Sequence, residues 1–353
     1  MYIINSKCWR YISLFILPII LISSCKKGKQ WVELPEIPLV ESAYTAVLLD
    51  SAIVYHTAPY NAFSDLTFYE GNFYLAFRAA ADHGFDNKAS VVVLKSKDFI
   101  RWGVFDNIKA EGHDLRDPKL LLYRGACYLN FSKVSPEGVS NRHQPQMYKL
   151  DDNRISFASP TAYVNSNYWY WYTGEFDGSL MTYGYSKNEV GFFRNNAGGI
   201  TPRCLLDIPN EPSEARFVRA KNQLFTLVRT QRKGVLAISD LSNICSPKLW
   251  QLPVYQFGGP NITVFDADNL LLSGRELIDN NNYGNFVKTS LYMYNIKSNT
   301  LSKLLVLPSF SDTGYAGHVV KGDTIFMSYY DHHPSTGKAV IKTARIKIVK
   351  KDV

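Results

Sequence analysis

The chain has 353 residues, of which 46% are hydrophobic, 14% aromatic and 20% charged, and its formal net charge is +8. This composition supports a sizeable folded core, and it excludes an intrinsically disordered chain, collagen, a coiled coil and a multi-span membrane protein. The 5 cysteines are too few for a disulfide scaffold. No long run of lysine and arginine points to nucleic acid as a partner.

The first 24 residues are typical of a bacterial export signal. Lys7 and Arg10 precede the apolar stretch 12–22, which is too short for a membrane span, where about 20 residues are needed. The sequence Ile22-Ser23-Ser24-Cys25 resembles a lipobox, whose cysteine is acylated and becomes the first mature residue. An ordinary signal peptide with a chance cysteine is the alternative.

Three parts are therefore predicted: a signal peptide at 1–24, a lipidated Cys25 with a polar tether at 25–42, and a folded domain at 43–353. The acyl chains would hold a monomeric soluble domain at a membrane. Lys26-Lys27 follows Cys25 where an inner-membrane retention signal would have aspartate, which favours the outer membrane, on its periplasmic or surface face.

From residue 43 onward the chain repeats a unit of an apolar strand, a tight polar turn and a second apolar strand. The six copies are Leu66–Phe77, Pro118–Phe131, Tyr172–Tyr185, Glu214–Arg229, Asn261–Arg275 and Ala316–Tyr330. Their turns are 44 to 54 residues apart, the period of a propeller blade. We predict an all-β, six-bladed β-propeller, with five blades as the alternative. We expect Ala46–Val54 to add a strand to the last blade and to close the ring.

Functional side chains of a propeller gather at one end of its central channel, where the second strand of each blade ends. An arginine stands at this place in three copies, as Arg78, Arg229 and Arg275. Guanidinium groups bind carboxylates bidentately and stay charged. We predict that these three arginines, with Arg116, hold a carboxylate ligand. The alternative is that each one pairs with an acidic side chain of the protein.

Acidic side chains enter the same end of the predicted channel. Asp65, Asp117 and Glu214 precede the first strands of copies one, two and four. Two carboxyl groups are the usual machinery of glycoside hydrolysis, one as the acid and one as the nucleophile or base. Asp65 or Asp117 would be the acid. Glu214, alone or together with Tyr330 or Tyr315, would be the nucleophile.

The remaining candidates would contact the ligand. Trp171 belongs to an aromatic run at 168–172 and would stack on a sugar ring, although packing between blades explains it equally well. Asn261 and Tyr315 stand before the first strands of copies five and six. His332-His333 has no cysteine or carboxylate at metal-ligand spacing, so no metal is expected. No nucleotide or cofactor motif occurs, so no cofactor is expected.

Several short motifs lie in one order at matching blade positions. They are Asn61-Ala62-Phe63-Ser64-Asp65-Leu66, Leu115-Arg116-Asp117-Pro118-Lys119, Gly258-Gly259-Pro260-Asn261, Gly274-Arg275-Glu276, Asp312-Thr313-Gly314-Tyr315 and Ser328-Tyr329-Tyr330. Over about residues 55–348 the chain resembles bacterial sialidase-like (BNR/neuraminidase superfamily) six-bladed propellers of the exo-α-sialidase type. The resemblance implies a pocket lined by Asp65, Arg78, Arg116, Asp117, Glu214, Asn261, Arg275, Tyr315 and Tyr330.

The sequence also departs from that group. The Phe-Arg-Ile-Pro motif of sialidases is absent, and Ala79-Ala80 follow Arg78 where the group usually has glutamate. A single degenerate Asp box remains, with Ser96, Asp98 and Trp102. A 2-keto acid sugar other than sialic acid, or a uronic acid, would satisfy the same arginines.

The sequence thus predicts an envelope lipoprotein that removes a terminal acidic sugar from glycans, with that glycan and the membrane as its partners. Two other functions stay open. One is a non-catalytic glycan-binding lipoprotein on the same propeller. The other is a protein-interaction propeller, in which the arginines pair internally and the channel is plugged. A five-bladed furanosidase is a further alternative.

Overall fold

The computed structural model describes residues 31–351, apart from 140–141, 152–153, 160–167, 188, 197–198, 279–286 and 334–336. The predicted signal peptide and Cys25 lie outside the described residues. The chain divides into two units, Met1–Trp31 and Val32–Val353, and the second contains the described strands. The described residues contain no helix long and apolar enough to cross a membrane.

The described strands form four sheets of four strands and one sheet of eight. The first four-stranded sheet contains β6 (Asp114–Tyr123), β7 (Ala126–Val134), β8 (His143–Asp151) and β9 (Arg154–Ser159), and the second contains β10 (Trp169–Phe176), β11 (Ser179–Tyr185), β12 (Val190–Asn196) and β13 (Gly199–Leu206). The third contains β14 (Ala215–Ala220), β15 (Gln223–Val228), β16 (Lys233–Asp240) and β17 (Lys248–Tyr255). The fourth contains β18 (Gly258–Val264), β19 (Asn269–Leu277), β20 (Val287–Asn295) and β21 (Thr300–Val306). The eight-stranded sheet contains β2 (Tyr60–Tyr69), β3 (Asn72–Ala80), β4 (Ser90–Ser96), β5 (Gly103–Lys109), β22 (Thr313–Lys321), β23 (Thr324–His333), β24 (Lys338–Lys350) and β1 (Tyr44–Tyr55).

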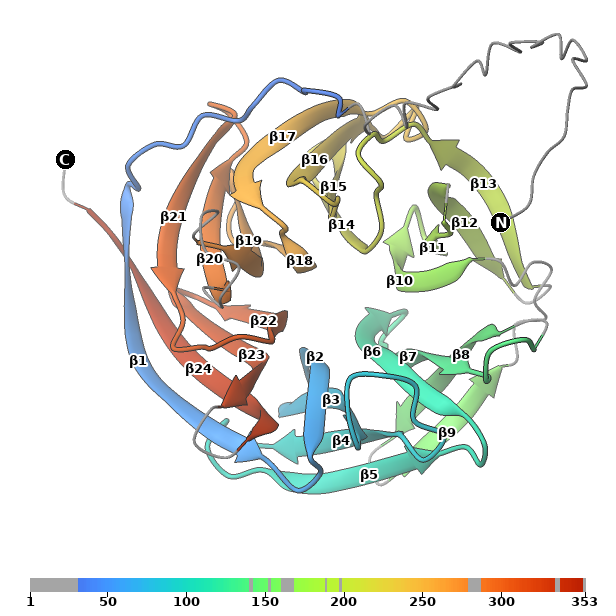
Figure 1. The fold of residues 1–353 in the computed structure, drawn as a ribbon. Coiled ribbons are helices and arrows are strands. Elements are labelled where there is room, and N and C mark those ends of the chain that lie inside the picture. The colour runs from blue at the N-terminus through green and yellow to red at the C-terminus, as the bar shows by residue number, and fades with distance from the viewer. Residues whose placement is uncertain are drawn as a thin grey trace, which may run out of the picture. The chain divides into compact units, whose positions relative to one another are not determined.

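The sheets stand around a central axis with one strand of each group innermost (Figure 1). Contacts run from β2 to β6, β10, β14, β18 and β22 and return to β2. This closed ring of antiparallel sheets is an all-β propeller, as predicted. The eight-stranded sheet is continuous through one parallel pair, Tyr60 with Ala339. The N-terminal strand β1 pairs along β24, which confirms the predicted closing strand.

All six predicted strand–turn–strand units are hairpins in the structure. The geometry of these hairpins is set locally, by the residues of their turns. Both residues of Glu70-Gly71, Arg124-Gly125 and Asp177-Gly178 have positive φ, the backbone geometry that fits the right-handed twist of the paired strands. These turns fix where each innermost strand ends and hence which residues reach the other end of the channel.

The core lies between neighbouring groups of strands around the ring, including the two halves of the eight-stranded sheet. Phe73 of β3 packs against Phe326 of β23 with ring centroids 4.9 Å apart, and Phe192 of β12 packs against Phe217 of β14 at 5.6 Å. A fully buried side chain of this size contributes about 1.5–3 kcal/mol to folding. Because each sheet buries both faces against its neighbours, the sheets hold the innermost strands at fixed positions.

Part of the predicted tether is bound to the propeller. We call Val32–Ser42 the strap. The Ile37 amide donates to the Gln251 carbonyl at 2.9 Å, the Val40 amide donates to the Leu301 carbonyl at 2.8 Å, and the Ile37 side chain is fully buried. The strap therefore crosses the outer strands β17 and β21. Ile37 and the backbone groups of the strap find partners there that a sequence pattern does not display.

One disulfide joins two sheets. Cys204 at the end of β13 is bonded to Cys245 in the β16–β17 connection, and Cys127 is a buried free thiol. The three cysteines that follow Cys25 allow at most one such bond, and their spacing does not give its partners. The degenerate Asp box forms the β4–β5 turn, where Asp98 Oδ1 accepts hydrogen bonds from the Ile100 and Arg101 amides at 2.9 and 2.8 Å.

Candidate functional site

The innermost strands each place one residue at the mouth of the channel. Five of them carry a bulge, because the register shifts between Ala62 and Asp65, Arg116 and Lys119, Tyr170 and Tyr172, Gly258 and Asn261, and Gly314 and Gly317. Bulges re-aim side chains and are common beside active sites. The residues at the bulges are Phe63, Asp117, Trp171, Gly259 and Tyr315, and Glu214 directly precedes the sixth innermost strand, β14. We call these six residues the mouth ring.

The backbone is strained at three residues of the mouth ring. The φ angles of Phe63, Asp117 and Tyr315 are 60°, 55° and 51°. Positive φ is uncommon for any residue with a Cβ and is an outlier for bulky ones. Gly259 also has a positive φ, 57°, and a Cβ there would lie 2.5 Å from Tyr315 Cδ2. Strain of this kind persists where the surrounding structure fixes it, which happens most often at functional sites.

Tyr315 and Glu214 form the central pair of the ring. The Tyr315 hydroxyl donates to Glu214 Oε1 at 2.5 Å, and Arg229 Nη1 donates to the same oxygen at 2.8 Å. The Gly259 amide donates to Glu214 Oε2 at 2.7 Å, so the carboxylate is held from both sides. Burial first, and Glu214 second, raise the pKa of Tyr315 well above its ordinary value. The phenol therefore keeps its proton, and Glu214 is placed to accept it.

Asp117 has the properties of an acid. Its side chain is buried, and burial raises its pKa to about 6, against the opposing charges of Lys119 and Arg116 and with support from Glu214. Asp117 and Trp171 line one cavity of about 10 Å³, room for a single water molecule. A carboxyl group with this pKa still carries its proton in mildly acidic solution and releases it near neutrality.

The Asp65 carboxylate accepts hydrogen bonds from two other innermost strands. Its Oδ1 accepts a hydrogen bond from Arg216 Nη1 at 2.8 Å, and its Oδ2 accepts one from the Leu120 amide at 2.8 Å. Because both oxygens are occupied and the side chain is fully buried, Asp65 ties β2 to β6 and β14. Of the two acids that the sequence left open, the geometry favours Asp117.

Arg78 is paired with an acidic side chain of the protein. Its side chain is fully buried, and its Nε and Nη2 donate to the two oxygens of Asp114 at 2.8 and 2.9 Å. The remaining donors bind the carbonyls of Asp82 and Gly84. Internal pairing, the alternative weighed for these residues, is therefore what the structure has at Arg78. Asp114 is the first residue of β6, whereas Arg78 lies in β3. The Arg78–Asp114 pair therefore depends on how these two sheets pack together.

Arg229 and Arg275 flank the Tyr315–Glu214 pair. Their side chains are 26% and 18% exposed, and each makes one internal ion pair, Arg229 with Glu214 and Arg275 Nη1 with Asp312 at 2.8 Å. The guanidinium of Arg275 lies 5.9 Å from the Tyr315 ring centroid. Both side chains are therefore partly accessible to solvent. The structure therefore places Arg229 and Arg275 beside the same tyrosine–glutamate pair.

Arg116 completes the charged side of the mouth. Its Nε lies 3.3 Å from Asp114 Oδ2, and its Nη2 donates to the His83 and Gly84 carbonyls. Its guanidinium lies 5.6 Å from the Phe63 ring centroid. It therefore supports the 81–89 connection and leaves 16% of its side chain exposed.

Tyr330 pairs with a carboxylate other than Glu214. Its hydroxyl donates to Asp312 Oδ1 at 2.5 Å, while Tyr60 donates to Asp312 Oδ2 at 2.6 Å and His83 Nδ1 lies 3.3 Å from that oxygen. Although burial opposes it, the hydrogen bonds of His83, Tyr330 and Tyr60 lower the pKa of Asp312. Of the two tyrosines that the sequence offered, only Tyr315 is bonded to Glu214.

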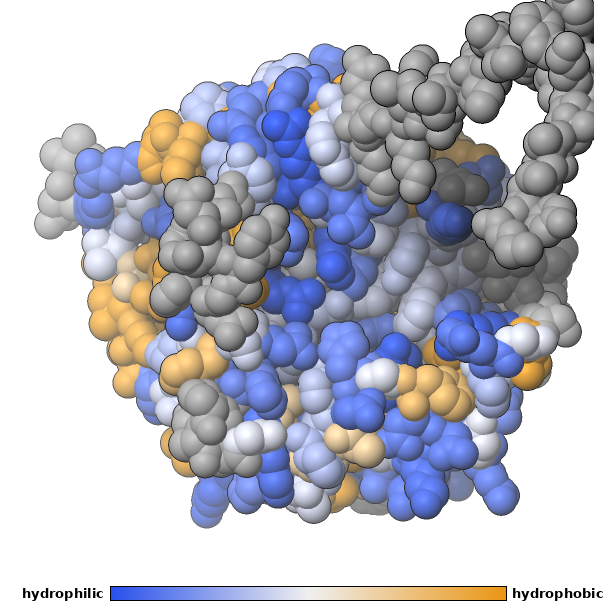
Figure 2. Space-filling view, viewed as in Figure 1, coloured by the Kyte–Doolittle hydropathy of each residue, from blue (hydrophilic) through white to orange (hydrophobic). Residues whose placement is uncertain are grey.

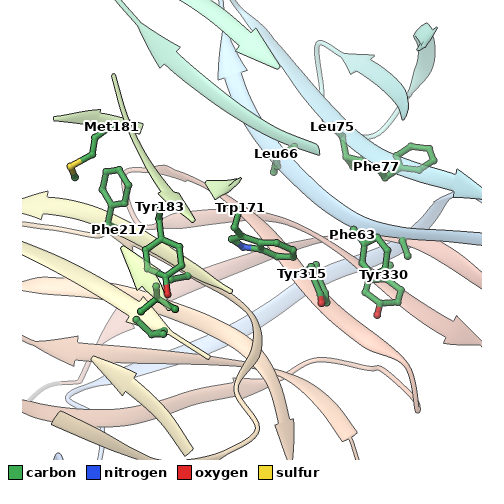
Figure 3. Close-up of a cluster of buried hydrophobic side chains, with 14 of the residues drawn as sticks. Phe63, Leu66, Leu75, Phe77, Trp171, Met181, Tyr183, Phe217, Tyr315 and Tyr330 are labelled. Carbon is green, nitrogen blue, oxygen red and sulfur yellow. The ribbon is translucent and has the colours of Figure 1, made fainter. Parts of the chain in front are cut away.

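Trp171 and Asn261 are packed residues. Trp171 is buried, with its ring centroid 5.7 Å from that of Tyr315 and Lys119 Nζ 4.8 Å from its ring. Asn261 is buried and donates through Nδ2 to the Ala316 carbonyl at 2.5 Å. Figure 3 shows Trp171, Tyr315, Phe63 and Tyr330 in one row, with the two tyrosine hydroxyls turned to the same side. These rings form the wall of the site.

Sequence reasoning missed Phe63 and Asp312. Phe63 contacts Tyr315 and Tyr330, with ring centroids 4.8 and 5.7 Å apart. Both residues occur inside motifs that were singled out, but nothing in a motif shows that Phe63 has a positive φ or that Asp312 receives Arg275. Figure 2 shows that the face around the channel is mostly hydrophilic. Among the described residues, no group of three His, Cys, Asp or Glu side chains is placed to hold a metal ion.

No family model matches the chain, and no curated protein matches it. A crystal structure of a protein of unknown function from Dyadobacter fermentans has a TM-score of 0.70 at 14% identity, over 86% of this chain and 99% of that one. Trypanosoma rangeli sialidase in complex with sialic acid has a TM-score of 0.56 at 10% identity, over 87% of this chain. The fold is a sialidase-like β-propeller.

The same sialidase in complex with 2,3-difluorosialic acid, a covalent intermediate, has a TM-score of 0.55 at 11% identity. The matched part makes up 59% of the length of the sialidase in both cases. At such identities the comparison concerns the fold.

Proposed function

We propose that the protein is a sialidase-like glycosidase that removes a terminal acidic sugar, sialic acid or a related 2-keto or uronic acid, from glycans. The observation that carries this proposal is the buried hydrogen bond from Tyr315 to Glu214 at 2.5 Å. A tyrosine attacks as a nucleophile when a carboxylate accepts its proton, and sialidases are the exception among glycosidases that use it. A neutral nucleophile suits an anomeric carbon that already bears a carboxylate.

The reaction has two steps. Tyr315 Oη attacks the anomeric carbon while its proton passes to Glu214, and Asp117 gives its proton to the glycosidic oxygen as that bond breaks. Water then attacks the anomeric carbon of the Tyr315 adduct and gives a proton to Asp117. The phenolate leaves and recovers its proton from Glu214. Every group returns to its starting state.

Arg229 and Arg275 would hold the carboxylate of the sugar, with Arg116 at the edge. Their partial exposure and their place on both sides of Tyr315 support this role. Guanidinium groups keep their charge and bind carboxylates through paired N–H donors. Arg78 is left out because Asp114 already takes its donors.

We also infer six blades. The eight-stranded sheet consists of β2–β5 and of β22–β24 with β1, and the two halves meet through a single parallel pair. Each half has the strand order of one four-stranded blade. Six innermost strands around the channel agree with this count.

We propose that the protein is a monomer anchored by lipid on Cys25 in the cell envelope, at the outer membrane. The lipobox-like sequence before Cys25 supports the anchor. The Cys204–Cys245 disulfide supports an exported location, because disulfides persist in oxidising compartments and are rare in the cytosol.

The test is a hydrolysis assay. The full chain is incubated with aryl glycosides of sialic acid, Kdo and uronic acids and with host and plant glycans, and the released sugar is identified by mass. We expect release of one acidic sugar, lost in Arg275→Ala. If none of these sugars is released but the same sugars raise the melting temperature, the protein is a glycan-binding propeller.

One observation favours a non-catalytic propeller as the second candidate. Arg78 forms an ion pair with Asp114, and the cavities beside Asp117 and Tyr315 have volumes of only about 10 Å³ each. A channel filled in this way fits a protein-interaction surface. In that case neither turnover nor a thermal shift with any sugar of the panel would be seen.

A further inference from the structure

One outer edge of the propeller carries aliphatic side chains that no described element covers. They lie on the strap, on β1 and at the end of β24. Their exposed fractions are Leu39 54%, Val40 42%, Val47 45%, Leu49 50%, Ile53 43% and Val349 44%. In Figure 2 hydrophobic residues gather along the edge where β1 runs in Figure 1.

The register places several of these side chains on one surface. Strand β1 pairs with β24, so Thr45 lies opposite Val349 and Val47 lies opposite Lys347. Residues directly opposite each other in an antiparallel pair point to the same face. A long edge strand with aliphatic side chains is a site where proteins associate unless something covers it. This surface is therefore suited to contact with a partner.

The length of the chain before the strap indicates which partner can reach this surface. Val32 follows the proposed lipid anchor at Cys25 by seven residues (32 − 25 = 7). Fully extended, seven residues span at most about 24 Å. The chain joins the propeller at Val32, whose amide donates to Asn210 Oδ1 at 2.9 Å, and the strap runs from there across β17 and β21 into β1. The proposed acyl groups are therefore tethered to the start of the strap, and the strap ends in the aliphatic edge.

Charge does not oppose contact with lipid. Lys347, Lys350, Lys351 and Arg345 are balanced by Asp323, Glu41 and Asp50, which leaves one net positive charge (4 − 3 = 1). Apolar burial would therefore drive the contact. A short link to an anchor keeps the local concentration of the surface high, so a small apolar area suffices.

We propose that the edge formed by the strap and β1 lies on the lipid surface, with Leu39, Val47 and Leu49 at the boundary between headgroups and acyl chains. This inference rests on the proposed lipid anchor and is independent of the proposed hydrolysis. The channel axis then runs along the membrane plane. The mouth ring opens sideways, and a glycan reaches it parallel to the membrane.

The test uses spin labels on the full-length acylated protein in vesicles of phosphatidylethanolamine and phosphatidylglycerol. Val47→Cys carries the label on the edge. Leu122→Cys on β6 is the control, with a similar exposed fraction of 49%. Cys8 is replaced by serine throughout. The cysteines of the described strands and connections do not compete, because Cys127 is buried and Cys204 is bonded to Cys245. Collision with oxygen and with a water-soluble nickel complex reports the depth of each label.

We expect the label at 47 to lose access to the nickel complex and to gain access to oxygen, while the label at 122 stays aqueous. In Cys25→Ser, the label at 47 should remain aqueous beside the same vesicles. An acylated protein whose two labels are equally aqueous, or equally shielded, overturns the proposal. Shielding of position 47 without vesicles would show that a second copy covers the edge instead. An unmodified Cys25 by mass would overturn both the anchor and this proposal.

Discussion

At the scale of single residues, the proposed chemistry depends on which tyrosine is bonded to Glu214. Tyr315 donates to Glu214, and Tyr330 donates to Asp312. The sequence could not separate them, because both lie near the same end of one predicted hairpin. The bulge between Gly314 and Gly317 turns Tyr315 toward the neighbouring sheets, and Tyr315 rather than Tyr330 is therefore bonded to Glu214.

Replacement of Tyr315 by phenylalanine should abolish hydrolysis and leave the fold intact. The variant loses the attacking oxygen, but Arg229 and Gly259 still hold the Glu214 carboxylate, so the free energy of unfolding should fall by only about 1–2 kcal/mol. Tyr329→Phe is the matched control, because the Tyr329 hydroxyl contacts Ser51 and the Pro308 carbonyl. Equal activity of the two variants in an aryl glycoside assay would contradict the assignment.

The pH dependence of activity should follow Asp117. Its pKa is raised to about 6 and the acid acts in its protonated form, so kcat/KM should fall as the pH rises above about 6. Asp117→Asn should remove this limb and lower the rate by about 10²–10⁴-fold.

The leaving group separates Asp117 from Tyr315. An aryl glycoside whose phenol departs without protonation should restore much of the rate of Asp117→Asn, since the missing proton is no longer needed. It should not restore Tyr315→Phe. Initial rates on phenols of graded acidity measure this difference, and equal sensitivity of the two variants would exclude Asp117 as the acid.

At the scale of elements, the bulges position the site and local turns position the strands. The sequence predicted all six hairpins because alternating apolar residues and turns such as Glu70-Gly71 act within a few residues. It did not predict the bulges, the strap or the Arg78–Asp114 pair. Each of these depends on contacts between segments distant along the chain or on different sheets. The positions of Asp117, Glu214 and Arg229 near the mouth could be predicted because they stand at hairpin ends.

Two glycines with similar backbones test the role of the bulge. Gly259 and Gly322 have φ angles of 57° and 60°, but a Cβ would meet Tyr315 only at Gly259 and has open space at Gly322. Gly322→Ala should cost about 1–2 kcal/mol of stability from the left-handed backbone alone. Gly259→Ala should cost more and should also reduce kcat, because Tyr315 must move. Chemical unfolding and initial rates check both. Normal activity of Gly259→Ala would show that the position of Tyr315 does not depend on this contact.

At the scale of the whole molecule, the ring is held by β1 on β24 and by the Cys204–Cys245 bond between two sheets. The bond closes a loop of 41 residues, so Cys245→Ala should lower the free energy of unfolding by about 2–4 kcal/mol. Denaturant unfolding measures the loss. A reducing agent should destabilise the wild type by a similar amount and leave the variant unchanged; destabilisation of both would point to another target.

The ring brings Tyr315, Glu214 and Asp117 together from three different sheets, and we propose that the three act together in hydrolysis. The most direct measurement is the mass of the protein after incubation with a 2,3-difluoro derivative of the acidic sugar that the hydrolysis assay identifies. We predict one added glycosyl group on the peptide containing Tyr315, absent in Tyr315→Phe. An adduct on another residue, or turnover of the parent sugar without any adduct, would contradict a tyrosine nucleophile at this site.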